Sequence, residues 1–219
     1  MSTSNMKALG LALIFAAALP AQNFNWSSPG VWEHQVTGVF GPPSIDRIVT
    51  GAPYSADELN EFTASDGTPT QVYVINHYAR DPQGRTRMER GYHAAPIRTT
   101  EIFDPVAGIA YLLDDQNKVA HRMLLPPAVP ITPVSGEKLG SRQMEGVLAE
   151  GTRTVNILTI DTWVSPELKI TMLTKSSNGY SSRLTGLTRT NPASALFQPP
   201  PGYTIIDETA PFPMAIPIR

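Results

Sequence analysis

The sequence predicts a mainly β protein: a curved antiparallel sheet, or unclosed β-barrel, of about ten strands with little helix. Three observations lead to this fold class. The 219 residues include 21 prolines and 16 glycines, which implies many turns and few long helices. Stretches of alternating apolar and polar residues recur, and turn signals separate them at intervals of about a dozen residues, as in an up-and-down meander. The hydrophobic fraction of 41% is enough for a core, and a charged fraction of 16% is too low for a disordered chain.

Residues 1–21 have the pattern of a secretory signal peptide. Lys7 is their only charge, Ala8–Leu19 is an unbroken apolar run, and Pro20-Ala21 supplies a helix breaker and a small residue at the cleavage site. The run is too short to span a bilayer, and an uncleaved N-terminal anchor is the alternative. We therefore expect an exported protein, periplasmic or extracellular, with no transmembrane segment after signal cleavage.

Charge and cysteine content exclude several classes of function. Signal cleavage removes one of the 17 basic residues and none of the 19 acidic ones, so the mature chain has a formal charge of −3. This balance gives no electrostatic reason to expect nucleic acid or an anionic membrane surface as a partner. The chain has no cysteine, which excludes disulfides, thiol catalysis and cysteine metal sites and is ordinary for a bacterial envelope protein.

Proline content divides the mature chain into segments. Residues 22–44 are expected to be a polar lead-in with a candidate first strand at Val31–Val39. Residues 45–206 are expected to form a single antiparallel β domain. Within it, four prolines mark residues 126–136 as a linker, because proline cannot donate to a sheet ladder. Residues 207–219 are a proline-rich C-terminal tail for which no fold is expected.

The clearest strand is Thr70–Ala79, which carries apolar residues on both faces and is therefore expected to be central. Tyr54–Ala64 fits either a short helix capped by Ser55 or a strand that runs into the Asp66-Gly67 turn, and we favour the strand.

Turn dipeptides set the remaining strand limits. Asp81-Pro82 and Asp104-Pro105 favour type I turns, and Asp114–Asn117 forms a third corner. Glu150-Gly151 and Asn178-Gly179 predict two further turns, the second with the strongest short hairpin signal in the chain. Carboxylates at such corners could bind Ca²⁺, but turn chemistry explains them without a metal.

The end of the β domain departs from the strand pattern. Asn191–Phe197 should form one helical turn that seats Leu196 and Phe197 on the core, because an N-cap residue and a proline open it. Tyr203–Ile206 is expected to add a last strand.

Four groups of residues support a resemblance to a known fold. They are FDPVAGIAYLLDDQNKVAHR at residues 103–122, Gln143–Gly146 followed by Glu150-Gly151, Trp163–Leu168, and Leu196-Phe197 followed by Pro201-Gly202-Tyr203. Together they resemble uncharacterised exported bacterial proteins whose strand order is similar to the LolA/LolB-type lipoprotein-carrier fold. Over most of residues 45–206, this resemblance implies an unclosed antiparallel barrel around a hydrophobic cavity, and it implies no site residue. The chain departs from that fold in lacking a lipid-anchoring cysteine and an evident N-terminal lid helix.

No motif indicates catalysis. Histidines 34, 77, 93 and 121 are far apart and lie in no metal-binding spacing. We interpret His77 as a hydrogen-bonded sheet histidine, and His93, in a loop, as the one histidine with room for another role. No G-x-S-x-G elbow and no glycine-rich phosphate loop is present. We therefore expect no catalytic residue, no metal site and no cofactor.

The one basic cluster comprises Arg80, Arg85, Arg87, Arg90 and Arg98. Alternation puts Arg85 and Arg87 on one face of a strand, which we interpret as a solvated or edge-protecting face. The functional alternative is recognition of an acidic partner or a lipid headgroup.

Our first functional hypothesis is a non-enzymatic binding or carrier module for a lipid, acyl chain or lipoprotein, held in the concavity of the curved sheet by apolar burial. The candidate lining residues are Val72, Val74, Ile109, Tyr111 and Met172. The alternative is a structural or interaction protein of the cell envelope that docks a partner through a sheet edge or its C-terminal tail. A hydrolase with a site assembled from distant residues is a third hypothesis, and no motif favours it.

Overall fold

The computed structural model describes residues 35–40, 48–64, 66–92, 95–127 and 135–217, with side chains for 48–64, 66–68, 76–91, 99–127 and 135–214. Its strands are β1 (Gln35–Phe40), β2 (Tyr54–Thr63), β3 (Pro69–Arg80), β4 (Thr86–Tyr92), β5 (Ala95–Asp104), β6 (Ile109–Asp114), β7 (Val119–Leu124), β8 (Glu137–Met144), β9 (Val147–Val155), β10 (Thr159–Ser165), β11 (Ile170–Ser176), β12 (Tyr180–Thr188), β13 (Thr204–Asp207) and β14 (Phe212–Pro217). The described residues also include the 3-10 helix η1 (Ser194–Phe197). Among these residues, no helix is long and apolar enough to cross a membrane. The mainly β class is confirmed, with more strands than the ten or so expected.

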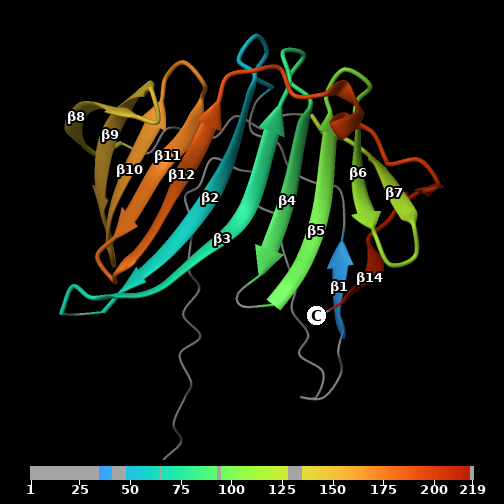
Figure 1. Ribbon diagram of the computed structural model, residues 1–219, viewed down its shortest axis with the longest axis horizontal. Helices are drawn as coiled ribbons and strands as arrows, with labels where there is room; N and C mark the ends of the chain where they lie inside the picture. The colour runs from blue at the N-terminus through green and yellow to red at the C-terminus, as the bar shows by residue number, and fades with distance from the viewer. Residues whose placement is uncertain (1–34, 41–47, 65, 93–94, 128–134, 218–219) are drawn as a thin grey trace, which may run out of the picture.

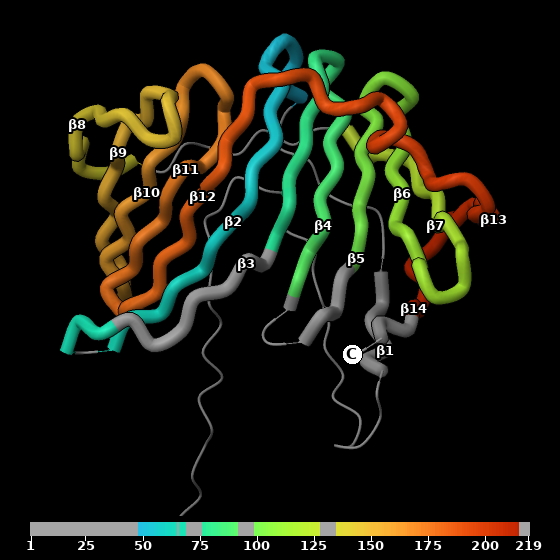
Figure 2. Tube along the Cα trace, in the orientation of Figure 1, coloured from blue at the N-terminus to red at the C-terminus, as the bar shows by residue number. Residues whose placement is uncertain are grey.

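Twelve of these strands form one curved sheet (Figure 1), in the order β13-β7-β6-β5-β4-β3-β2-β12-β11-β10-β9-β8. Two meanders build it: β2 to β7 fill one half, β8 to β12 fill the other, and β12 pairs antiparallel with β2. Figure 2 shows this junction, where the orange β12 runs beside the cyan β2. The two halves of the chain therefore share one continuous sheet.

The sheet does not close into a barrel. Its two ends are β8, which pairs with β9, and β13, which lies parallel to β7. Every other neighbouring pair in the sheet is antiparallel. Outside it, β14 pairs with β1 in a two-stranded sheet, so part of the C-terminal segment for which no fold was expected is a strand.

Aspartates form the corners between the strands of the first half. Asp81, Asp104 and Asp114 each accept hydrogen bonds, at 2.9–3.0 Å, from backbone N–H groups two to four residues further along. These bonds satisfy donors that the strands leave unpaired at each turn. No group of side chains in the described ranges is arranged to hold a metal ion, and turn chemistry accounts for these carboxylates.

The turn predicted at Glu150-Gly151 is wrong. Both residues lie within β9, and the chain turns instead at Glu145-Gly146, where both residues have positive φ angles of 48° and 77°. A Cβ atom on Gly151 would lie 2.8 Å from the ring of Trp163. The glycine at this position therefore admits an aromatic ring against the backbone and does not mark a turn.

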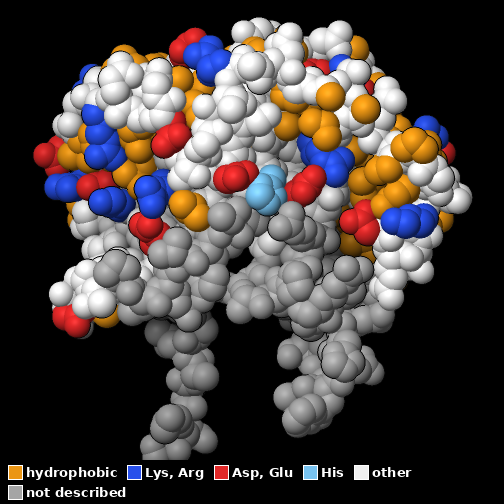
Figure 3. All heavy atoms as spheres, in the orientation of Figure 1, with side chains coloured by type: hydrophobic (Ala, Val, Ile, Leu, Met, Phe, Trp, Pro, Cys, Tyr) orange, Lys and Arg blue, Asp and Glu red, His pale blue; other side chains and the backbone are white. Residues whose placement is uncertain are grey.

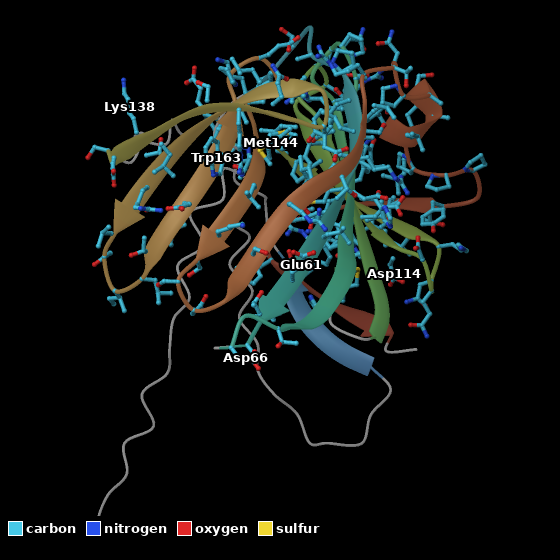
Figure 4. All side chains as sticks on the ribbon, turned by 60° about the vertical axis from the view of Figure 1, so that its left-hand side comes forward. Glu61, Asp66, Asp114, Lys138, Met144 and Trp163 are labelled. Carbon is cyan, nitrogen blue, oxygen red and sulfur yellow. The ribbon has the colours of Figure 1, made fainter. Side chains whose placement is uncertain are left out.

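The central strands carry different residues on their two faces. We call the face with Tyr78 and Met88 the inner face, and the face with His77 and Arg87 the outer face, because side chains alternate along a strand. On the inner side, Tyr78 and Met88 belong to a buried cluster that includes Met172 from the second half of the sheet. Met144 and Trp163, both labelled in Figure 4, pack against this cluster. The inner cluster therefore joins the two halves of the sheet.

The segment around η1 covers part of the outer face. Phe197 is 1% exposed and packs with Ala79, Ile102, Leu113 and Ala120 of the first half. The predicted helical turn forms and seats Phe197, but it begins at Ser194 with Ala193 as its N-cap and no side-chain cap bond, so the predicted start at Asn191 is wrong. Leu196 is 38% exposed and is not seated on the core. The outer face beside η1, toward β12, stays open to solvent.

Candidate functional site

A partly buried carboxylate, Glu58, connects β2 to β12 on the inner face. Glu58 accepts hydrogen bonds from Asn76 Nδ2 at 2.5 Å and from the Tyr78 hydroxyl at 2.6 Å, and its other oxygen accepts one from Ser182. Burial, together with the Glu58 carboxylate, raises the pKa of Tyr78 well above its ordinary value, so the phenol stays a neutral donor. This network joins three neighbouring strands and is a structural element of the sheet.

An ion pair follows on the inner face of the next two strands. Arg90 Nε lies 2.9 Å from Glu101 Oε1, and the Glu101 side chain is 2% exposed. Burial raises the pKa of Glu101, and the neighbouring Arg90 partly opposes that shift. The pair fixes the register of β4 against β5 inside the core.

Arg80, at the end of β3, is a buried cation without a carboxylate partner among the described residues. It is 4% exposed, and its guanidinium donates to the carbonyl oxygens of Ala52 (3.0 and 2.8 Å) and Leu168 (2.6 Å). The guanidinium carbon lies 4.8 Å from the centre of the Tyr54 ring. The positive charge is therefore balanced only by carbonyl dipoles and an aromatic face.

Burial changes the pKa values of both Arg80 and Tyr54. It lowers the pKa of Arg80, and it raises the pKa of Tyr54 to about 12 although the neighbouring Arg80 works in the opposite direction. Tyr54 is consequently neutral at physiological pH and cannot serve as a counter-anion for Arg80.

Arg80 lines a hollow of about 60 Å³, and most of the other lining residues have apolar side chains. Val49, Phe103 and Leu125 are among them, and Thr86 is the one other polar side chain of the lining. A charged donor in such surroundings is unusual, because an unpaired charge at low dielectric constant is costly.

On the outer face, a histidine lies between two acids. Asp57, His77 and Glu89 are direct cross-strand neighbours on β2, β3 and β4, and Figure 3 shows the pale blue imidazole between two red side chains. His77 Nδ1 is 2.5 Å from Asp57 Oδ1, and since an ionised carboxylate only accepts, Nδ1 carries the proton. Arg87 Nε donates to Glu89 at 3.0 Å, and its Nη1 donates to the Leu196 carbonyl at 3.3 Å.

A hollow of about 260 Å³ opens beside this row. It exists because β12 bends away from β2: their pairing shifts between Thr185 and Thr188, and Gly186 takes a φ of 61°. Ser55 and Thr188 line the hollow with hydroxyl groups, and Leu196 lines it with an apolar side chain.

Of the five lining residues suggested by the sequence, the three with described side chains line neither hollow. Met172 is fully buried in the inner cluster, Tyr111 packs against the cluster around η1, and Ile109 is partly buried at the start of β6. Val72 and Val74 belong to β3, and their side chains lie outside the described residues. The lining of a concave cavity by these residues stays a prediction.

The basic cluster is divided by the sheet. Arg80 and Arg90 lie on the inner face, whereas Arg87 lies on the outer face and Arg85 pairs with Asp81 at the corner before β4. The edge-protecting role is wrong for these residues, because β4 lies between β3 and β5. The side chains of Arg98, His34 and His93 lie outside the described residues.

Sequence reasoning missed the pairing of Asp57 with His77, although a signal for the neighbouring pairs exists. Counting outward equally from Asp66-Gly67 pairs Leu59 with Val74, as observed. The same count would pair Asp57 with Asn76, but a one-residue bulge in β3 moves the partner to His77.

Comparisons with known proteins give little beyond a distant likeness of fold. No family model matches the chain, and no curated protein matches it. Among solved structures, PNGF-II in the P21 and C2 space groups is similar, at 13% and 14% identity and a TM-score of 0.44 in each case. The match covers 72% of this chain but only 32% and 31% of those chains, so this chain spans about a third of their length. A likeness this weak carries no inference about activity.

His77 is a hydrogen-bonded sheet histidine, which confirms the expectation from the sequence.

The two hollows differ in the groups that they present to a ligand. The inner one presents a buried cation among apolar walls, and the outer one presents hydrogen-bonding groups near carboxylates.

Proposed function

We propose that the protein is a non-enzymatic binding and carrier module for an acyl chain with a carboxylate head, and that Arg80 holds this head. The observation that carries the proposal is a guanidinium that is 4% exposed, has no carboxylate among its described hydrogen-bond partners and lines a hollow with apolar walls.

The donor count supports an anionic ligand. A guanidinium has five N–H groups, and the three hydrogen bonds of Arg80 use the Nε–H and both N–H groups of Nη2, which leaves the two N–H groups of Nη1. A carboxylate can accept from Nη1, and such charge-assisted bonds are about twice as strong as neutral ones. A bound carboxylate would therefore supply the compensating charge that the neighbouring carbonyl groups do not.

The surroundings of the hollow support an apolar tail. A volume of about 60 Å³ holds a head group and not a whole acyl chain, so the tail would continue along the surface. Ile48, one of the lining residues, is 51% exposed and offers apolar surface to such a tail. Each methylene group buried there would contribute about 0.8 kcal/mol.

This proposal develops the carrier hypothesis drawn from the sequence and moves its recognition site. The basic cluster supplied the headgroup alternative, and Arg80 is the member of that cluster with a buried, apolar setting. With the predicted signal peptide, such a carrier would operate outside the cytoplasm.

A head-group series on the full chain tests the proposal. We expect isothermal titration calorimetry to show binding of laurate, with dodecanol weaker by about tenfold or more because it lacks the charge that Arg80 recognises. Dodecyltrimethylammonium should not bind at this site. Equal affinity for all three amphiphiles, or no binding of laurate, would contradict the proposal.

A further inference from the structure

The outer hollow gathers polar groups that the described residues leave without hydrogen bonds. Asp57 accepts a single bond, from His77, which leaves its Oδ2 available, and His77 Nε2 has no partner among the described residues. The hydroxyl groups of Ser55 and Thr188 line the same hollow. No side-chain hydrogen bond joins either hydroxyl to another described residue.

All of these groups can accept hydrogen bonds. Nδ1 of His77 carries its proton toward Asp57, so Nε2 is an acceptor whenever the ring is neutral. A carboxylate oxygen accepts only, and a hydroxyl oxygen accepts through two lone pairs. The cation of the lining, Arg87, forms an ion pair with Glu89, which lines the same hollow, so its charge is compensated there.

We propose that this hollow binds the primary ammonium group of an aliphatic chain. An ammonium ion has three donors and no acceptor, which complements the acceptors that Asp57, Ser55 and Thr188 offer in this hollow. Ala79 and Leu196 give the lining apolar surface for methylene groups, and about 260 Å³ accommodates a chain of a few carbons. The chemistry is shared by a free alkylamine and by a lysine side chain of another protein.

The site goes beyond the proposed carrier function and stands apart from it. Asp57 and His77 lie on the outer face, whereas Arg80 lies on the inner face and has no contact with either of them among its hydrogen bonds. Failure of the laurate experiment would not count against the ammonium site, and failure of the ammonium experiment would not count against the carrier function.

The test uses n-pentylammonium chloride as the probe and n-pentanol as the neutral control, on the full chain. We expect titration calorimetry to show saturable binding of the amine, at least about tenfold tighter than the alcohol. The imidazole signals of His77 should shift with the same saturation curve in proton–carbon NMR spectra. Asp57→Asn should weaken amine binding by about tenfold or more.

Matched variants keep the result interpretable. Glu61→Gln removes a carboxylate from the outer face of the same strand, outside the hollow, and should leave the affinity unchanged. Thr188→Trp changes an exposed rim residue and should block the hollow without touching Asp57, so it should abolish binding in a chain that folds normally.

Two further ligands identify the source of the ammonium group. Tighter binding of a blocked Gly-Lys-Gly peptide than of cadaverine would assign the site to a lysine side chain, and the reverse order would assign it to a free amine. No binding of pentylammonium, equal binding of pentanol, or unchanged affinity in Asp57→Asn would overturn the proposal.

Discussion

Arg80 and His77 are three residues apart on β3 and belong to opposite faces of the sheet. Arg80 is 4% exposed, donates to uncharged carbonyl oxygens and lines a small apolar hollow. The His77 side chain is 37% exposed, is bonded to a carboxylate and lines a larger hollow with polar groups. The comparison shows that two ionisable groups of one strand are compensated differently, Arg80 by carbonyl dipoles and His77 by a carboxylate.

The two sites should differ in how strongly they are coupled to folding. The bonds of Arg80 connect β3 to Ala52 and to the β10–β11 turn at Leu168, so it is part of what holds the inner core together. The pair of Asp57 and His77 is partly solvated, and such pairs contribute little to stability. Changes at the inner site should therefore affect both binding and folding, and changes at the outer site should affect binding alone.

The largest effect is expected from Arg80→Met. This change leaves the Ala52 and Leu168 carbonyl oxygens buried without their donor, and we expect the free energy of unfolding to fall by about 3 kcal/mol. Urea unfolding measures the difference, with Arg183→Met as the control, because Arg183 forms an exposed pair with Glu61 worth under about 1 kcal/mol. An equal loss in the two variants would remove the distinction between inner and outer charges.

A smaller effect concerns the pH dependence of stability at two carboxylates, Glu101, whose side chain is 2% exposed, and Asp161, whose side chain is 22% exposed. Burial raises the pKa of Glu101 above its ordinary 4.5, whereas the Arg153 hydrogen bond holds the pKa of Asp161 below its ordinary 3.8. The folded state therefore binds a proton at Glu101 more readily than the unfolded state does, and at Asp161 less readily.

The signs of the two slopes are opposite. As the pH falls from 7 toward 4.5, wild type should gain stability relative to Glu101→Gln, because the folded chain takes up a proton first. As the pH falls below about 4, wild type should lose its advantage over Asp161→Asn, because the ion pair with Arg153 is neutralised. Thermal unfolding between pH 7 and 3.5 checks both, and slopes of the same sign would contradict the assignment.

Much of the fold could be predicted because its signals are local. Asp81, Asp104 and Asp114 form corners through bonds to their own neighbouring N–H groups, so a short stretch of sequence carries the whole interaction. Asn178-Gly179 likewise forms the predicted hairpin turn between β11 and β12. Turn chemistry and alternation are enough to place strands between such corners.

The rest depends on contacts between distant residues. Gly151 suggested a turn, but its role is set by the Trp163 ring on the neighbouring strand. The partner of Asp57 is set by a bulge in β3 that shifts the register by one residue. Arg80 gave no sign of its burial, because the carbonyl oxygens that receive its hydrogen bonds are 28 and 88 residues away.

The affinity of laurate for Arg80→Lys and for Arg87→Lys, each compared with wild type, tests the central claim most directly. Both variants keep the net charge of the chain, but a lysine ammonium cannot replace the planar guanidinium, which donates to the Ala52 and Leu168 carbonyl oxygens and keeps Nη1 for a carboxylate. We predict that Arg80→Lys weakens laurate binding by about tenfold or more and that Arg87→Lys leaves it unchanged. Unchanged affinity in a folded Arg80→Lys variant, or an equal loss in both variants, would contradict the account.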